Sequence, residues 1–297
     1  MDFELSELQQ MVVDSARRFV AAEFGLEQWQ RRRGLADGVD PARWSQMVDL
    51  GWLAVLVPEA AGGLGGSMED AALLMIELGR GLVVEPVVSN AILGVHLFAG
   101  QDDWLGRIAT GACCVALAHL DPEQPGTRGL AARAADGGYV LSGEKFMAHD
   151  APAADQLVVA ASLDGQPALF IVPRDSVGLT LDSYALIDGS RAADLLFDDL
   201  RLPAGALLAS GAEAAERLDR ALDHARLALV AQAVGAIEAA LEITADYAKQ
   251  RQQFGQPIGK FQAIQHLAAD SFVAAYQARS ALYAGLRDID AAPAARA

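Results

Sequence analysis

The residues from Leu218 to Thr244 constrain the fold most, because their apolar side chains follow two faces of one long helix. One face carries Leu218, Leu222, Ala225, Leu229, Ala233, Ala236, Ala240 and Thr244, and a second carries Leu227, Val230, Val234, Ile237 and Leu241. A helix that is apolar on two faces has to pack on more than one side. Since the pattern begins near Gly211, we expect a helix of roughly 40 residues in a bundle shared between subunits.

The segment from Arg251 to Gln265 follows this helix and holds the most informative group of side chains. Gly255 and Pro257 break helical continuity, because glycine tolerates unusual φ values and proline lacks a backbone donor. A guanidinium, two phenylalanines and several amides surround the break, a set that can hold a phosphate and pack on an aromatic ring. The alternative is an ordinary joint between two helices with a solvated arginine. A second long helix is predicted from about Gln262 to Asp288.

Composition restricts the class of protein. A chain of 297 residues, 53% hydrophobic and 21% charged, can bury a substantial core. Its net charge of -16 disfavours nucleic acid and anionic membranes as partners.

Cys113 and Cys114 are the only cysteines, so no metal-binding spacing exists and no metal is expected. The N-terminus lacks the pattern of a secretory signal, and the apolar run from Ala225 to Leu241 contains charged residues, so we expect a cytoplasmic protein that does not span a membrane.

Three regions are predicted along the chain, giving an α+β multidomain fold. Residues 1–110 should form a helical N-terminal domain, with helices from Ser6 to about Gln30 and near 41–50, 68–79 and 86–98. Residues 111–205 contain short apolar runs separated by Gly, Pro and Asp, which predict an antiparallel β domain; the runs are 112–118, 139–142, 157–161, 168–172 and 194–197. Residues 206–297 should form a C-terminal helical domain with only two long helices. The glycine-rich run at 62–66 lacks a phosphate-loop pattern and is expected to be a turn before a helix.

Several motifs resemble those of the flavin-dependent acyl-CoA dehydrogenase family. The pattern Arg-x-x-Phe-Gly-x-Pro-Ile-x-x-Phe-Gln-x-x-Gln, starting at Arg251, is similar to the loop that joins the first two C-terminal helices in that family. Val57-Pro58-Glu59 with the glycine-rich run resembles its N-terminal domain. Residues 141–145 and 196–203 match two landmarks of its β domain. The resemblance covers essentially the whole chain and implies the family's helical, β and helical domains.

The resemblance also implies functional residues. Family members hold FAD between the β domain and the C-terminal bundle, and pass a hydride from an acyl-CoA to the flavin after a glutamate removes a proton. Arg251, Phe254 and Gln262 match positions that contact the ADP portion of an FAD held mainly by the neighbouring subunit. Asp223 and Arg226 match positions that line the acyl-CoA path. The alternative for this last pair is an i,i+3 salt bridge on a helix.

Departures from the family pattern are equally informative. The Thr-Glu and Gly-Ser-Asp residues that hold the flavin ring are replaced by the run 118–123, which lacks the hydroxyl donor. The Trp and hydroxyl of a second flavin motif are lost in Lys145-Phe146-Met147-Ala148-His149. His119 and His149 could substitute as hydrogen-bond partners, although ordinary core or surface histidines are the simpler interpretation. The segment that carries the catalytic glutamate in most relatives has no counterpart, and a minority position on the first C-terminal helix is occupied by Ala225. No catalytic residue is therefore assigned.

These observations favour a subunit of a hetero-oligomeric acyl-CoA dehydrogenase, inactive alone, in a heterotetramer with a complete partner chain that supplies the base. The resemblance implies an acyl-CoA substrate and, as an electron acceptor, an electron-transfer flavoprotein. Short subunits of this kind occur in bacterial steroid side-chain degradation, although fatty acyl-CoA catabolism also remains open. The alternatives are a non-enzymatic structural subunit without flavin and a truncated form of a homotetrameric enzyme.

Overall fold

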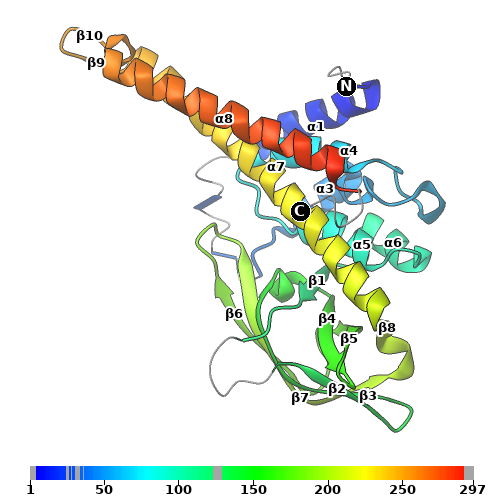
Figure 1. Ribbon diagram of the computed structural model, residues 1–297. Helices are drawn as coiled ribbons and strands as arrows, with labels where there is room; N and C mark the ends of the chain where they lie inside the picture. Colours follow the sequence, from blue (N-terminus) through cyan, green and yellow to red (C-terminus); the bar gives the residue numbers. More distant parts are fainter. Residues whose placement is uncertain are drawn as a thin grey trace. The chain divides into compact units, whose positions relative to one another are not determined.

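The computed structural model describes residues 5–24, 27, 29–30, 34–35, 37–122 and 129–290. Its contacts divide the chain into two compact units. The first unit contains Met1–Gly25, Met68–Val83 and Arg226–Ala297, and the second contains Leu26–Ser67 and Val84–Ala225. Figure 1 shows the helices, the β-sheet and the long helical hairpin that make up these units.

The first unit is helical. It contains α1 (Glu7–Glu23), α4 (Met68–Arg80), the second part of α7 (Ala212–Gln250) and α8 (Gln262–Asp288). Ser6 caps α1 in a reciprocal capping box with Gln9, which satisfies two backbone donors at the start of the helix. The helix predicted to reach about Gln30 ends earlier, at Glu23, because Phe24 takes an extended backbone conformation and is buried.

An ion-pair network connects the four helices of this unit. Arg17 of α1 binds Glu77 of α4, with a distance of 2.7 Å between Nη2 and Oε1. Arg80 of α4 binds Glu242 of α7. Arg279 of α8 binds Glu238 of α7 through two nitrogens, at 2.5 and 2.6 Å. Glu238 and Glu242 of α7 are thus both paired with arginines within this unit.

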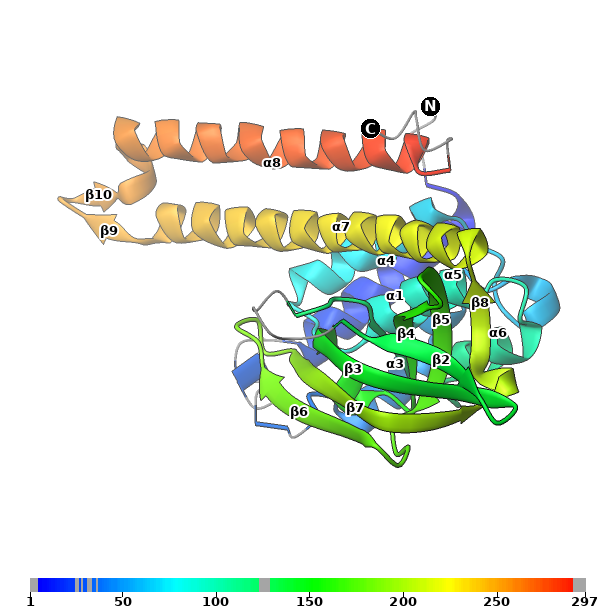
Figure 2. The same ribbon diagram turned by 60° about the horizontal axis from the view of Figure 1, so that its bottom comes forward.

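Helices α7 and α8 form an antiparallel hairpin, drawn in yellow and red in Figure 2. Their predicted boundaries are close to the observed ones, because Gln250 is followed by the Gly255 and Pro257 break. By length and hydropathy, α7 is the one helix among the described residues that could cross a membrane, but long bundle helices of soluble proteins pass the same test. Its most apolar window is 22% buried. Much of the apolar surface on this hairpin is therefore still exposed.

The second unit contains a sheet and several short helical elements. The helical elements are α3 (Pro41–Asp49), η1 (Trp52–Ala54), η2 (Glu59–Ala61), the π-helix η3 (Val88–Gly94), α5 (Val95–Leu97), α6 (Asp102–Ala109), η4 (Ala151–Ala153) and η5 (Ala204–Ala206). The helix predicted near 86–98 is thus a π-helix continued by one short α-helical segment. The glycine-rich run at 62–66 leads into α4 as a loop, as predicted.

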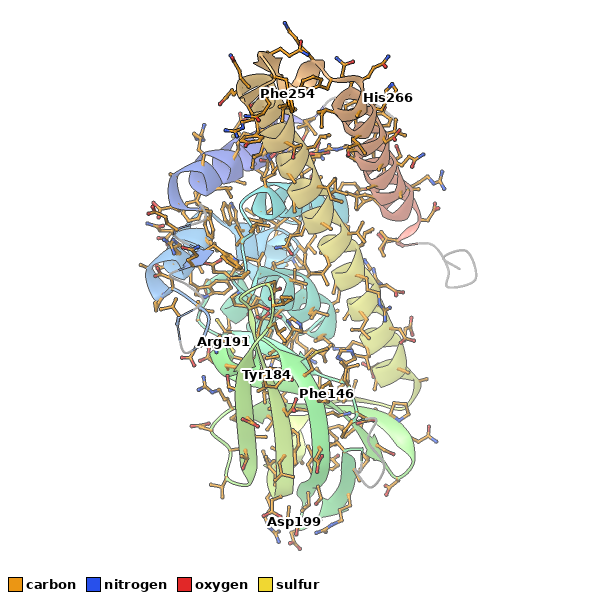
Figure 3. The ribbon with its side chains drawn as sticks, turned by 90° about the vertical axis from the view of Figure 1, so that its left-hand side faces the viewer. Phe146, Tyr184, Arg191, Asp199, Phe254 and His266 are labelled. Atoms are coloured by element: carbon orange, nitrogen blue, oxygen red, sulfur yellow. The ribbon has the colours of Figure 1, made fainter. Side chains whose placement is uncertain are left out.

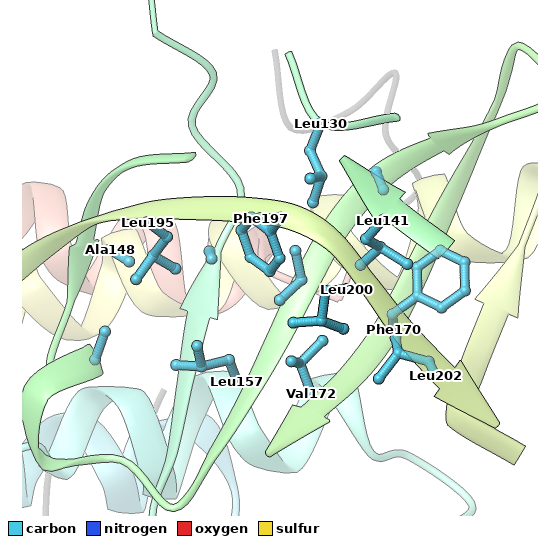
Figure 4. Packing of buried hydrophobic residues seen from close by; sticks show 14 of the residues in the cluster. Leu130, Leu141, Ala148, Leu157, Phe170, Val172, Leu195, Phe197, Leu200 and Leu202 are labelled. Atoms are coloured by element: carbon cyan, nitrogen blue, oxygen red, sulfur yellow. The ribbon is translucent and has the colours of Figure 1, made fainter. Parts of the chain in front are cut away.

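The sheet has eight strands and is mainly antiparallel. The order is β6-β7-β3-β2-β4-β5-β8, and β1 pairs with β4 in parallel. The strands are β1 (Val115–Ala118), β2 (Ala131–Ala135), β3 (Gly138–His149), β4 (Gln156–Leu163), β5 (Gln166–Pro173), β6 (Leu179–Ala185), β7 (Arg191–Pro203) and β8 (Leu207–Ser210). Figure 4 shows the core between them, where Leu141, Phe170 and Phe197 are among the fully buried side chains.

Two irregularities interrupt the pairing of β3 with β7, one after Leu141 and one after Lys145. Each contains a residue with positive φ, Asp199 at 47° and Met147 at 46°. A carboxylate accepts a hydrogen bond at each irregularity. Asp199 accepts a hydrogen bond from Ser142 at 2.7 Å, and Asp194 accepts one from the backbone N–H of Met147 at 2.9 Å. The end of β3 is therefore a fixed, non-ideal strand of the kind found beside functional sites.

Candidate functional site

The tip of the α7–α8 hairpin is a tight β-turn. The short strands β9 (Gln252–Gln253) and β10 (Gln256–Pro257) pair through Gln253 and Gln256, which leaves Phe254 and Gly255 as the two turn residues. Their φ values are 52° and 80°, so both lie in the left-handed region that a type I′ turn requires. The backbone N–H of Ile258 donates to the carbonyl oxygen of Arg251 at 2.8 Å and closes the loop. The predicted break between the helices is thus an ordered hairpin.

Phe254 occupies an unfavourable conformation in this turn. Asparagine, aspartate and glycine are preferred where φ is positive, and a bulky aromatic residue there is strained. Phe254 is nevertheless 91% exposed, and it makes an edge-on ring contact with Phe261 at 6.1 Å between centroids. Figure 3 shows its ring at the end of the hairpin. A strained and exposed aromatic side chain is poorly explained by the stability of the isolated chain and is typical of a binding contact.

The other predicted cofactor contacts lie close by in the sequence. Arg251 is the exposed residue between α7 and β9, and Gln262 is the exposed first residue of α8. The tip thus presents an accessible guanidinium, an aromatic ring and an amide, a combination suited to a phosphate linked to a planar base.

The predicted acyl-CoA residues lie on α7. Asp223 is half-buried and Arg226 is exposed. The division between the two compact units falls after Ala225, so the two residues belong to different units. Their assignment to the acyl-CoA path stays a prediction.

In the β domain, the residues that replace the family's flavin motifs bond to one another. Lys145, only 3% exposed, places Nζ 2.6 Å from a carboxylate oxygen of Asp121 and 3.3 Å from the carbonyl oxygen of His119. Burial lowers the pKa of Lys145, and the bond to Asp121 opposes this. The backbone N–H of Phe146 donates to the carbonyl oxygen of Leu120 at 2.8 Å. These polar groups are consequently already engaged within the chain.

Sequence reasoning missed a carboxyl group at the end of β3. Asp150 follows His149 directly, has a φ of 60°, and accepts a hydrogen bond from the Ser89 hydroxyl at 2.5 Å. Its backbone N–H donates to the carbonyl oxygen of Arg191. Burial raises the pKa of the Asp150 carboxyl, and Asp188 adds to this effect, whereas Ser89 and His149 oppose it. A positive φ cannot be read from the sequence around an Asp-Ala pair, so no local signal identified the residue.

Within the described residues, neither metal-binding groups nor the surface hollow on α6 suggests another site. Among the described residues, no three His, Cys, Asp or Glu side chains gather as a metal site would require. A surface hollow of about 520 Å³ on α6 is lined by Asp103, Trp104 and Arg107 and contains none of the predicted site residues.

The helical N-terminal part, the β-sheet middle domain and the C-terminal helices match the fold of acyl-CoA dehydrogenases. Family models agree: the acyl-CoA dehydrogenase N-terminal domain matches residues 6–112, and the C-terminal domain matches residues 214–297. The chain is 32% identical over 296 residues to the probable acyl-CoA dehydrogenase YngJ of Bacillus subtilis, covering 91% of this chain and 76% of that protein. The chain belongs to the acyl-CoA dehydrogenase family.

Solved structures agree with this family assignment. The fold is similar to a chain of the ChsE4-ChsE5 complex from Mycobacterium tuberculosis, with a TM-score of 0.88 and 26% identity, covering 99% of this chain and 81% of that chain. It is also similar to a chain of the Tcur3481-Tcur3483 steroid ACAD, with a TM-score of 0.85 and 28% identity, covering 97% and 80% respectively. Members of this family are oxidoreductases that bind FAD.

The residues of this chain that match the family's FAD contacts differ between the hairpin tip and the β domain. The exposed Arg251, Phe254 and Gln262 of the hairpin tip suit the ADP portion of the cofactor. In the β domain the hydroxyl donors of the family's flavin motifs are replaced: Leu120 and Met147 offer no side-chain hydrogen-bond donor, and Lys145 beside them is bound to Asp121. The chemistry that a bound flavin supplies is the acceptance of a hydride.

Proposed function

We propose that this chain is a subunit of a hetero-oligomeric, FAD-dependent acyl-CoA dehydrogenase that catalyses α,β-dehydrogenation of an acyl-CoA. In this proposal a complete partner chain holds most of the FAD and supplies the catalytic base, and the isolated chain is inactive. Arg251, Phe254 and Gln262 contact the ADP portion of the partner's FAD, while Asp223 and Arg226 line the acyl-CoA path. A steroid side chain or a fatty acyl chain is the expected substrate class, with an electron-transfer flavoprotein as acceptor.

The observation that carries this proposal is the exposed apolar surface of the α7–α8 hairpin. Its large exposed side chains on α7 are Leu229, Val230, Ile237, Ile243 and Tyr247, and those on α8 are Leu267, Phe272, Val273 and Tyr276. Solvent-exposed apolar patches of this kind mark interfaces. Helices of a related chain would complete a mixed bundle on this surface. The two similar structures named above are themselves assemblies of two different chains, which supports a heterotetramer here.

The test is co-expression with a full-length acyl-CoA dehydrogenase from the same genome. Purification should give a complex whose mass corresponds to a heterotetramer and whose flavin absorbance exceeds that of this chain alone. An acyl-CoA panel with an artificial electron acceptor then identifies the substrate. A partner that does not co-purify, or flavin bound equally by the isolated chain, would contradict the proposal.

Arg251 provides a sharper test of the cofactor contact. Arg251→Ala should lower the flavin content of the complex without changing its subunit ratio, because the exposed guanidinium contributes only to phosphate binding. Lys249→Ala is the matched control, since Lys249 is also exposed, lies two residues away and pairs only with Asp246 among the described residues. Equal flavin contents for both variants would show that Arg251 does not contact the cofactor.

A structural subunit without flavin is a second candidate, favoured by the engaged polar groups around Lys145 and Asp121. It predicts that Arg251→Ala leaves the flavin content unchanged and that the chain only raises the thermal stability of its partner. A truncated homotetrameric enzyme is a third, and it predicts a catalytic glutamate encoded downstream of residue 297.

A further inference from the structure

Two histidines outside the predicted site face each other in the second unit. His96 lies in α5, directly after the π-helix η3, and His224 lies in the first part of α7. Their ring centroids are 3.8 Å apart and the rings are tilted by 43°. His224 is only 2% exposed. The pair lies where Val95, Leu97 and Phe98 pack in one apolar cluster with Ala214 and Ala221 of α7.

The polar contacts of the pair give a protonated His96 little compensation. Nδ1 of His224 lies 2.8 Å from the carbonyl oxygen of Arg220. A carbonyl oxygen can only accept, so Nδ1 carries the proton and donates, which leaves Nε2 of a neutral His224 as an acceptor. Nε2 of His96 is buried and has no hydrogen-bond partner within the described part of the chain. An imidazolium at His96 would therefore be poorly compensated.

The charges around His96 also disfavour its protonation. Burial is the main cause that lowers the pKa of His96 to about 3, and His224 and Arg220 lower it further. Arg217 also approaches α5, donating to the carbonyl oxygen of Leu97 at 2.9 Å while it pairs with Glu213. Arg220 is thus the cation of α7 that acts on His96, whereas Arg217 is paired with Glu213.

We propose that the His96–His224 stack is an acid-sensitive latch that fastens the first turns of α7 to α5. At neutral pH the His96 ring is uncharged and stacks on His224 beside the apolar cluster. In acid, the open state gains a proton on His96, since an exposed histidine titrates near 6.5. The opening equilibrium should therefore rise by up to about tenfold per pH unit below pH 6.5. This inference does not depend on the proposed enzymatic function.

Hydrogen exchange of the full chain tests the latch. After correction for intrinsic exchange rates, the opening constant for amides in residues 217–224 should increase between pH 7 and pH 5 in the wild type. His96→Phe keeps an aromatic ring against His224 but cannot be protonated, so its opening constant should change much less with pH. His266→Phe removes an exposed histidine of α8, labelled in Figure 3, and should behave as the wild type does.

Two outcomes would overturn the proposal. One is a wild-type opening constant that does not change between pH 7 and pH 5, and the other is a His96→Phe variant with the pH dependence of the wild type. If His96→Phe does not fold, His96→Gln and a nitrogen NMR titration of the wild-type imidazoles take its place. A His96 ring that becomes charged in the closed state near pH 6.5 would equally exclude the latch.

Discussion

Gly79 of α4 lies directly against the backbone of Gln232 on α7: a Cβ added to Gly79 would stand 1.9 Å from the Gln232 carbonyl oxygen. The contact is reciprocal, because a Cβ added to Gly235 of α7 would stand 1.8 Å from the carbonyl oxygen of Ile76 on α4. Gln232 also donates its side-chain amide to the carbonyl oxygen of Val83 at 2.7 Å. The two helices therefore cross at backbone distance, which only glycine permits.

The first prediction concerns this crossing. Gly79→Ala should destabilise the chain by about 1–3 kcal/mol, because the obstructing atoms are backbone and cannot rotate away. This net loss comes despite the gain of roughly 1 kcal/mol that alanine brings to a helix interior. Gly205→Ala is the control, since no atom lies within 4 Å of its added Cβ. Urea unfolding measures the stability of both variants. Equal unfolding midpoints would show that α4 and α7 can move apart to accommodate the methyl group without a loss of stability.

The second prediction concerns the buried lysine of β3. Asp121→Asn should destabilise the chain by about 1–3 kcal/mol, because it leaves the buried Lys145 cation without its countercharge. Lys145→Met should cost less, since the side chain of Asp121 is 56% exposed and water can solvate it. Chemical unfolding of both variants at pH 7 tests this order. A Lys145→Met variant less stable than Asp121→Asn would show that packing of the lysine chain matters more than its charge.

The third prediction separates stability from binding at the hairpin tip. Phe254→Asn should stabilise the isolated chain by roughly 1 kcal/mol, because asparagine suits the left-handed position of a type I′ turn. The same change should lower the flavin content of the proposed complex. Val177→Asn replaces another apolar side chain, 94% exposed but outside the hairpin, and should change neither quantity. Thermal denaturation and flavin absorbance are the measurements, and a destabilised Phe254→Asn variant would mean that the phenylalanine supports the fold.

The fourth prediction is a pH dependence set by Asp150. Because burial raises the pKa of this carboxyl in the folded state, the folded chain retains a proton that the unfolded chain has released. The associated stability is fully present below the unfolded pKa of about 3.9 and is lost as the pH rises through the folded pKa. Asp150→Asn stays uncharged and keeps an acceptor for Ser89. The melting temperature of Asp150→Asn should therefore rise relative to that of the wild type as the pH increases from 4.5 to 8. A difference between the two melting temperatures that stays constant with pH would contradict a buried, protonated Asp150 carboxyl.

The sequence predicted the family and the three kinds of region because their signals are local. The two long helices followed from side-chain periodicity, and the break between them from Gly255 and Pro257. The β runs near 139–142, 157–161, 168–172 and 194–197 fall within β3, β4, β5 and β7. Strand β2, with the sequence Ala-Ala-Arg-Ala-Ala, was missed because alanine favours helix and the strand is fixed by its pairing with β3 and β4. Strand β6 lies at the edge of the sheet and is mostly exposed, so its residues carried little apolar signal.

By itself, then, the sequence determined the lengths of the two C-terminal helices, the position of the hairpin tip and the membership of the acyl-CoA dehydrogenase family. Only the tertiary structure decided that Phe254 is strained and exposed, that Lys145 is bound to Asp121, and that His96 stacks on His224. The physical reason is that periodicity and turn chemistry act between neighbours in the chain. Conversely, a close contact between distant residues depends on how strands and helices pack, and it leaves no pattern in the residues on either side.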